Sequence, residues 1–339
     1  MAYAEFSTKL KEYLSVAQGR NVSLRDIREF MKIEPGSSDD ENLRKTMAVS
    51  LVKQKIVTPS GRGDGIYKVI KQVQLVQVFG KNRQRRLPFE LHFPRCFTTE
   101  MELLFAESIV IREGDLITIG GTKSSGKTNL CLNFCAENID NAPVLMGNEY
   151  TVAVEGDYEP APRFLERLDK MSEWVVWVNG NGMDKFTLLP VRDDYAEHIE
   201  INRINIIDWI NIDANQLYDI GKVLESIKAK LGRGIGIVAL QKGEGAINPR
   251  GGQFVRDFSD VELLLDTFGK NPHDVLLTIK GVKEATKPII GKTFAYTIGE
   301  SGTKIFNFRE VKRCKGCMGS GNFKGHECEE CYGAKWTDK

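Results

Sequence analysis

The chain has 339 residues, 41% of them hydrophobic and 27% charged, a composition typical of a globular protein with one large core and one or two small modules. No apolar run has the length of a membrane span, and the start MAYAEFSTKLKEYL lacks the layout of a signal peptide, so we expect a cytoplasmic protein without membrane contact. Residues 1–100 hold 18 Lys and Arg against 11 Asp and Glu, a net +7, which leaves −6 for residues 101–339. The basic end is therefore the expected contact for a polyanion such as nucleic acid.

Three short helices and a strand pair are expected in residues 1–72. Apolar side chains recur at helical spacing in residues 4–16, a second helix opens at Ser23, and a third follows EPGSSDD as far as about Lys55. The stretch IVTPSGRGDGIYKVI then predicts two strands around a turn, which completes the outline of a winged helix. A protein-docking domain of the same shape is the alternative. In the DNA-binding interpretation, four basic residues lie on or near the recognition helix and wing: Arg44, Lys45, Lys53 and Arg62.

A basic linker is expected at residues 73–100, where apolar periodicity is lost. It contains the run KNRQRR, residues 81–86. Such runs are usually solvated, and direct contact with phosphates is the other possibility.

Residues 101–308 alternate apolar strands with helical stretches. The expected strands are DLITIG, APVLMG, WVVWVNG, RINIIDWI, GIGIVALQ and VELLLD, and helices such as KTNLCLNFCAENI lie between several of them. This alternation predicts an α/β domain, with a mostly parallel sheet covered by helices on both faces.

The stretch GGTKSSGKT fits the pattern G-x-x-x-x-G-K-[ST] between a predicted strand and a predicted helix. Glycines in such a loop let backbone N–H groups surround the phosphates of a nucleotide, here ATP. Lys127 is expected to reach the β- and γ-phosphates and Thr128 to ligate Mg²⁺. The predicted nucleotide-binding residues are Gly121, Thr122, Lys123, Ser124, Ser125, Gly126, Lys127 and Thr128.

Three polar residues at the ends of later strands are candidates for the chemistry. Asp208 ends the apolar run INII and is expected to face the Mg²⁺, with a buried capping aspartate as the alternative. Glu149 ends the strand after the P-loop helix, where a carboxylate can accept a proton from the attacking water. Gln241 closes GIVALQ and could sense the γ-phosphate or serve as a structural amide.

In this order the motifs resemble the RecA-like ATPase core, particularly DnaB-type replicative helicases and related phage ATPases, over about residues 101–300. The resemblance implies a homo-oligomer, either a hexameric ring or a filament, with ATP sites between subunits and DNA, more readily single-stranded, in the channel. It also implies that residues 242–256 form a DNA-facing loop. The basic residues of that loop are Lys242, Arg250 and Arg256.

The sequence departs from this family near the end of the core. At the position of Val282 in this chain, these helicases have an arginine that reaches the γ-phosphate bound by the neighbouring subunit. Lys280 and Lys283 flank that position, and a lysine supplies charge without the bidentate fork of arginine. Action of either lysine on a neighbouring subunit therefore stays open.

Residues 309–339 contain two C-x-x-C pairs, CKGC and CEEC, separated by ten residues. Four soft ligands at this spacing predict a structural Zn²⁺ site, with free or redox thiols as the alternative. The first pair resembles the C-x-x-C-x-G-x-G repeat of the DnaJ cysteine-rich domain, and His326 is expected to be a loop residue. DNA and a partner protein are both reasonable contacts for this zinc ribbon. The four predicted ligands are Cys314, Cys317, Cys328 and Cys331.

The leading hypothesis is a DNA-associated RecA-like ATPase. It couples hydrolysis of Mg·ATP to DNA translocation, unwinding or remodelling in replication or recombination. One alternative is a DNA- or protein-binding module in which the nucleotide acts as a switch without motor activity. A KaiC-like signalling ATPase shares the core but gives no reason for the flanking modules.

Overall fold

The computed structural model describes residues 3–61, 65–71, 87–147, 149–210, 219–243 and 246–339. The chain forms two compact units, Met1–Arg85 and Arg86–Lys339. Residues 87–100 of the expected linker belong to the larger unit, where the buried Phe93 ring lies 5.6 Å from that of Phe105 and 5.4 Å from that of Phe134. The stretch 72–86, with the basic run, lies outside the described residues.

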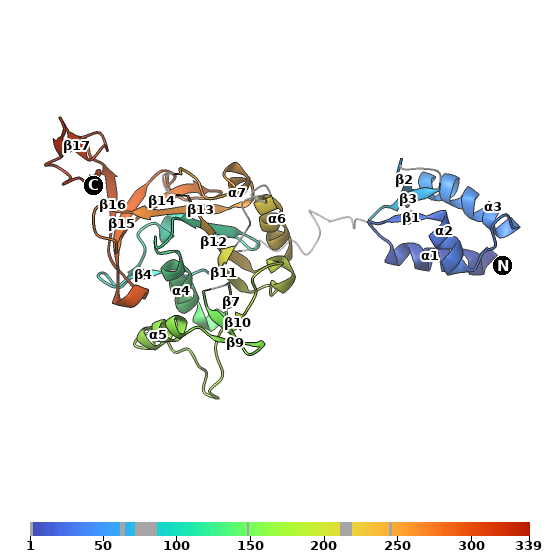
Figure 1. The fold of residues 1–339 in the computed structure, drawn as a ribbon, viewed down its shortest axis with the longest axis horizontal. Coiled ribbons are helices and arrows are strands. Elements are labelled where there is room, and N and C mark those ends of the chain that lie inside the picture. Colours follow the sequence, from blue (N-terminus) through green and yellow to red (C-terminus); the bar gives the residue numbers. More distant parts are fainter. Residues whose placement is uncertain (1–2, 62–64, 72–86, 148, 211–218, 244–245) are drawn as a thin grey trace. The chain divides into compact units, whose positions relative to one another are not determined.

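The N-terminal unit contains the predicted helices and strand pair (Figure 1). Its second helix starts where expected, because the Ser23 hydroxyl and the Asp26 carboxylate cap each other's main-chain N–H groups. Val22, just before this cap, lies in a short strand that the sequence did not predict. This strand pairs with β3, so the predicted strand pair becomes a three-stranded sheet. The elements are α1 (Tyr3–Val16), β1 (Asn21–Ser23), α2 (Leu24–Met31), α3 (Ser38–Lys45), a π-helical turn (Thr46–Leu51), β2 (Val57–Pro59) and β3 (Ile66–Val69).

A ten-stranded sheet forms the centre of the larger unit, in the order β10-β7-β11-β12-β6-β13-β14-β15-β16-β19. The first six strands run parallel, and the last four are antiparallel. The parallel strands are β6 (Leu116–Gly121), β7 (Val144–Met146), β10 (Thr187–Leu189), β11 (Ile204–Ile210), β12 (Ile235–Gln241) and β13 (Val261–Thr267). The antiparallel strands are β14 (Asp274–Val282), β15 (Thr293–Gly299), β16 (Lys304–Arg313) and β19 (Trp336–Asp338).

Helices cover both faces of this sheet, because alternate residues of a strand point to opposite sides. On β12, Ile237 packs into the core shared with α4, and its neighbour Val238 packs into the core shared with α6. Figure 1 shows the two helices and β12. The predicted α/β class with a mostly parallel sheet is confirmed. The helices are α4 (Lys127–Glu137), α5 (Pro162–Met171), α6 (Ile220–Lys230) and α7 (Gln253–Phe258).

The described part of the larger unit also contains three two-stranded antiparallel sheets. They are β4 (Arg95–Cys96) with β5 (Met101–Glu102), β8 (Thr151–Val154) with β9 (Asp157–Pro160), and β17 (Asn322–Phe323) with β18 (His326–Glu327). No described helix is both long enough and apolar enough to cross a membrane.

The prediction of a sheet strand at WVVWVNG is wrong. Trp177 and Val175 turn into the core, and the Trp177 ring N–H donates to the carbonyl oxygen of Leu168 over 3.1 Å, which ties this segment to α5. Val176 is exposed, and β10 takes the sheet edge beside β7 instead. Val175 and Trp177 therefore pack into the core rather than forming a strand of the main sheet.

The expected boundary at residues 308 and 309 falls inside β16, which continues without interruption to Arg313. After the cysteine-bearing segment the chain returns to the sheet, because β19 pairs antiparallel with β16, with Trp336 opposite Arg313. The four cysteines therefore lie in an excursion from the edge of the main sheet.

Candidate functional site

The P-loop lies between β6 and α4, as the sequence predicts. Gly126 adopts a φ of +93°, and a Cβ added there would come within 2.6 Å of the Ile298 side chain. At Gly121 an added Cβ would come within 2.3 Å of the Ser125 hydroxyl oxygen. The positive φ of Gly126 therefore favours glycine in the close turn that brings backbone N–H groups to the start of α4, and Gly121 leaves room for the Ser125 hydroxyl.

Lys127 is buried at the first position of α4 and folds over the loop. Its Nζ donates to the carbonyl oxygens of Gly121 over 3.0 Å and Thr122 over 2.7 Å. Burial lowers the pKa of Lys127, and the charge of the nearby Asp208 opposes that change. The ammonium group thus lies where it can neutralise phosphate charge held by the loop.

Asp208 lies on β11 and is completely buried. Burial raises its pKa to about 6, although the hydroxyls of Thr128 and Tyr150 favour the charged form. The Tyr150 hydroxyl donates to Oδ2 over 3.0 Å, whereas Oδ1 has no hydrogen-bond partner among the described residues. A buried carboxylate oxygen without a donor, beside the hydroxyl of Thr128, is the oxygen-rich ligand set that Mg²⁺ prefers.

Gly147 allows the end of β7 to lie against Asp208. Its φ is +135°, and a Cβ added there would lie 1.8 Å from the main-chain oxygen of Asp208. No side chain fits at that distance, so glycine at position 147 is a condition for this site. Asn148, the next residue, lies outside the described residues.

A pocket of about 1050 Å³ opens over the P-loop. The predicted residues Glu149 and Gln241 both line it, Glu149 exposed and Gln241 half-buried. Trp209 also lines it, immediately after the buried Asp208. The structure thus brings the P-loop, Glu149 and Gln241 together around one pocket, with Asp208 buried beside Thr128.

Part of the pocket wall was not expected from the sequence. Arg163 and Arg167 of α5 line it, as does the 3-10 turn Glu300–Gly302 between β15 and β16. Asn129 of α4 donates to the carbonyl oxygen of Gly302 over 2.8 Å, which fixes this turn against the P-loop helix. Spacing of four residues on a helix would have placed the two arginines on one face, but no motif connects that face to the pocket.

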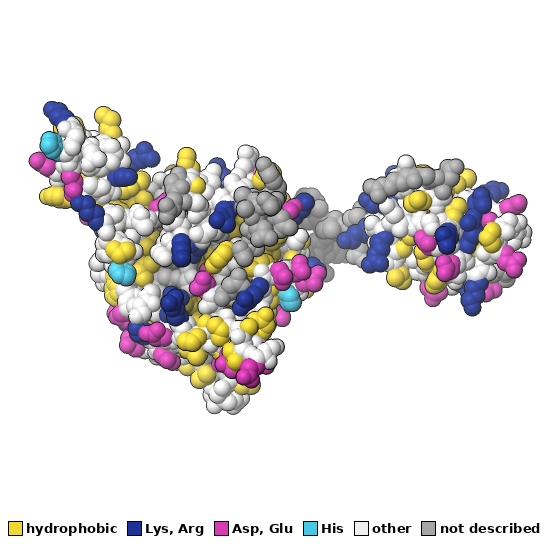
Figure 2. Space-filling view, viewed as in Figure 1, with side chains coloured by type: hydrophobic (Ala, Val, Ile, Leu, Met, Phe, Trp, Pro, Cys, Tyr) yellow, Lys and Arg dark blue, Asp and Glu magenta, His cyan; other side chains and the backbone are white. Residues whose placement is uncertain are grey.

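The basic residues predicted to contact DNA have different environments. In the N-terminal unit, Lys45 and Lys53 are exposed, Arg44 lies 3.4 Å from the buried carboxylate of Asp40, and Arg62 lies outside the described residues. Figure 2 shows basic side chains interspersed with acidic ones on the visible face of this unit.

In the larger unit, Lys242 is buried and paired with Asp266, so its charge is not presented to solvent in this structure. Arg256 is half exposed and lies 3.3 Å from the buried Glu262. Arg250 lines the nucleotide pocket.

The two lysines near Val282, Lys280 and Lys283, also lie in different environments. Lys283 donates to Asp260 over 2.9 Å, and Asp260 also pairs with Lys228. Lys280 is half-buried near Glu262, where burial raises the pKa of that carboxyl and the charge of Lys280 opposes the change.

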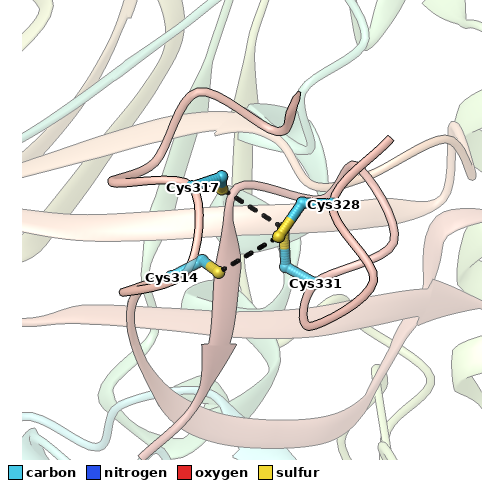
Figure 3. A group of neighbouring side chains, drawn as sticks. All are labelled: Cys314, Cys317, Cys328 and Cys331. Carbon is cyan, nitrogen blue, oxygen red and sulfur yellow. Dashed lines mark hydrogen bonds between the residues drawn. The ribbon is translucent and has the colours of Figure 1, made fainter. Parts of the chain in front are cut away.

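The four C-terminal cysteines converge, with their side chains pointing toward one another (Figure 3). All are buried, and their sulfur atoms lie within 4.8 Å of one another. The Sγ atoms of Cys314 and Cys328 are 3.8 Å apart, and those of Cys317 and Cys331 are 3.6 Å apart. The main-chain N–H of Gly321 donates to Cys317 Sγ over 3.2 Å, a contact typical of the outer shell of thiolate metal sites. The exposed His326 is not part of this cluster.

No family model and no curated protein matches the chain. Among solved structures it is similar to the RadB recombinase, at 16% identity and a TM-score of 0.41, over 58% of this chain and 91% of that one. It is also similar to a KaiC-like protein from the hyperthermophilic archaeon Pyrococcus horikoshii, at 16% identity and a TM-score of 0.44, over 65% of this chain and 99% of the other. Similarities this distant do not assign an activity to the chain.

Proposed function

We propose that the larger unit is a P-loop ATPase that holds Mg·ATP in the pocket over β6 and α4. The observation that carries the proposal is Asp208, a fully buried carboxylate whose Oδ1 has no hydrogen-bond partner among the described residues. It lies beside Thr128, the P-loop hydroxyl that the motif assigns to Mg²⁺. A structural aspartate in a core would be expected to have both oxygens satisfied.

The roles of the loop residues follow from their positions. The N–H groups at the start of α4 and the Lys127 ammonium bind the phosphates. Thr128 and Asp208 would hold the Mg²⁺, which supplies positive charge to the β- and γ-phosphate oxygens.

Glu149 is the proposed general base. Its side chain is exposed on the pocket wall, where water can reach it. A glutamate carboxylate in contact with solvent is available to accept a proton from a water that attacks the γ-phosphate. Gln241, on the neighbouring wall, offers an amide that can bond both the water and the phosphate.

We propose further that the protein is a RecA-like, DNA-associated ATPase, assembled as a homo-oligomer and acting in replication or recombination. The order of its motifs and the α/β core around them support this proposal. The winged-helix-like N-terminal unit and Arg256, whose side chain is half exposed, would contact the DNA phosphates. The exposed candidates of the N-terminal unit are Arg44, Lys45 and Lys53.

The cysteine cluster is proposed to hold one structural Zn²⁺. Four buried thiols within 4.8 Å of one another fit a closed tetrahedral site, and all four are free cysteines in this structure. The ion would tie the two halves of the excursion between β16 and β19 together.

A second candidate function is a binding module in which the nucleotide acts as a switch without motor activity. Two pairings favour it, since Lys242 is engaged by Asp266 and Lys283 by Asp260. Lys242 is thus withheld from solvent, whereas Lys283 is exposed and engaged within its own chain in this structure.

Turnover of ATP with and without single-stranded DNA separates these functions. A motor should hydrolyse ATP faster when DNA is present, and Lys127→Ala should abolish both rates. A slow rate that DNA leaves unchanged would favour the switch. Absence of ATP binding by the wild-type protein would overturn both.

A further inference from the structure

Arg250 lies in an unexpected place. The resemblance to helicases assigns it to a DNA-facing loop, but the structure places it in the wall of the pocket that Lys127 and Gln241 also line. Arg250 is exposed, and none of the carboxylates within the described ranges forms an ion pair with it. Its guanidinium is thus available to an anion in the pocket.

The backbone at Arg250 is fixed from three sides. Its main-chain N–H donates to the carbonyl oxygen of Gln241 over 2.9 Å. Pro249 packs on β6, where a Cβ added to Gly120 would lie 3.1 Å from the proline side chain. Gly251 packs on α6 so closely that an added Cβ would lie 2.2 Å from Ile220. The arginine therefore projects from a rigid base at the end of the strand beside the P-loop strand, which favours a defined position for its charge.

In the family that this chain resembles, an arginine of the neighbouring subunit supplies a positive charge to the γ-phosphate. This chain lacks that arginine. Val282 stands where the resemblance implies an arginine that reaches a neighbouring subunit. Lys283, one residue later, is held by Asp260 of its own chain over 2.9 Å. An arginine that adds positive charge to that of the P-loop lysine and the Mg²⁺ accelerates transfer of the γ-phosphoryl group.

The other arginines of the pocket lie on a different wall. Arg167 Nε is 3.7 Å from the position of a Cβ added to Gly302, in the turn that Asn129 holds. That turn flanks the side of α4, whereas Arg250 adjoins Gln241 at the end of β12, next to the P-loop strand. Arg250 is therefore the pocket arginine whose backbone is held beside Gln241, the residue predicted to sense the γ-phosphate.

We propose that Arg250 acts in cis, from the same subunit as the P-loop, to stabilise the γ-phosphoryl group during hydrolysis. The proposal rests on the ATPase function proposed above. In the step, the water oxygen forms a bond to the γ-phosphorus, the bond from that phosphorus to the β–γ bridging oxygen breaks, and the water proton passes to Glu149. ADP and phosphate leave, and the guanidinium neutralises charge on the γ-oxygens without bonding covalently.

The first measurement is steady-state hydrolysis together with ATP binding for Arg250→Ala, Arg250→Lys and a control, Arg233→Ala. Arg233 is exposed in the turn before β12, at the opposite end of that strand from Gln241. Arg250→Ala should lower kcat on the order of 10³-fold while ATP affinity changes only a few-fold, because the contact is strongest in the transition state. Arg250→Lys should recover part of the rate, and Arg233→Ala should match the wild type.

The second measurement mixes Arg250→Ala with Lys127→Ala subunits. If the arginine acts in cis, every mixed site lacks either its lysine or its arginine, so the rate equals the sum of the two variants alone. A rate well above that sum would show that Lys127→Ala subunits donate Arg250 to their neighbours, and would overturn the cis assignment. Wild-type turnover in Arg250→Ala would remove the residue from the chemistry altogether. If the wild-type protein itself does not hydrolyse ATP, the proposed function fails, which is a distinct outcome.

Discussion

The hydroxyl of Tyr150 donates to Oδ2 of Asp208 over 3.0 Å, inside a core where both side chains are fully buried. Tyr150 follows Glu149 directly, so the residue after the proposed base orients the proposed Mg²⁺ ligand. This contact links the residue that precedes β8 to Asp208 of β11.

Tyr150→Phe should therefore weaken both stability and Mg²⁺ use. The change leaves Asp208 without its donor, which costs about 1–3 kcal/mol of unfolding free energy. Tyr296→Phe is a matched control for stability, because the buried Tyr296 hydroxyl has no hydrogen-bond partner among the described residues. Denaturant unfolding of both variants checks the stability difference, and titration of turnover with Mg²⁺ checks the site. Equal unfolding free energies for the two variants would contradict the role given to Tyr150.

Asp40 should make the N-terminal unit sensitive to acid. The main-chain N–H of Gly36 and the guanidinium of Arg28 hold the pKa of Asp40 below its ordinary value. A carboxyl whose pKa is lower in the folded state contributes stability above its unfolded pKa, near 4, and that contribution disappears as pH falls through the folded value. Asp40→Asn should lose the contribution at neutral pH and flatten this acid dependence, measured by thermal melting from pH 7 to pH 3. If Asp40→Asn melts like the wild type at every pH, Asp40 does not make this contribution to stability.

The cysteine cluster should bind one equivalent of Zn²⁺ per chain. Cys328→Ser removes one of four ligands and should abolish stoichiometric zinc in the purified protein while the ATPase core stays folded, because the core has its own buried apolar residues. His326→Ala, a change at an exposed neighbour outside the cluster, should retain the metal. Elemental analysis of both variants decides the matter, and full zinc content in Cys328→Ser would contradict the site.

The exposed lysines of the N-terminal unit should affect DNA affinity through counterion release. Replacing Lys45 and Lys53 together with alanine should weaken binding of DNA and reduce the slope of log K against log salt by about one for each DNA phosphate that is no longer neutralised. Lys9→Ala is the control, since Lys9 already pairs with Glu5 over 2.8 Å. If the double variant keeps the wild-type slope, the unit is better explained as a protein-docking domain.

The sequence could predict the parts of this fold that depend on local chemistry. The P-loop, the helix cap at Ser23 and the strands that carry Asp208 and Gln241 are each specified by a few neighbouring residues, and they lie in the stretches where they were expected, although β11 continues past Asp208 to Ile210.

What could not be predicted depends on contacts between distant segments. WVVWVNG has the composition of a strand, but Trp177, one of its two tryptophans, packs inward and hydrogen-bonds to Leu168 of α5. The return of β19 to β16 depends on residues 309–339 folding back on the sheet, and the two arginines of α5 reach the pocket only through the packing of that helix. Arg250 shows the same limit, because its loop was assigned by motif order while its position is set by packing on Gly120 and Ile220.

The most direct test of the account is Glu149→Gln in a steady-state ATPase assay with a parallel measurement of ATP binding. The substitution removes the proton acceptor and leaves the phosphate-binding loop and Thr128 intact. We predict that the variant binds Mg·ATP with nearly wild-type affinity and accumulates in the ATP-bound form, while turnover falls by about 10²–10⁴-fold. Hydrolysis at the wild-type rate in this variant would contradict the proposed chemistry of the pocket, even if Lys127→Ala were inactive.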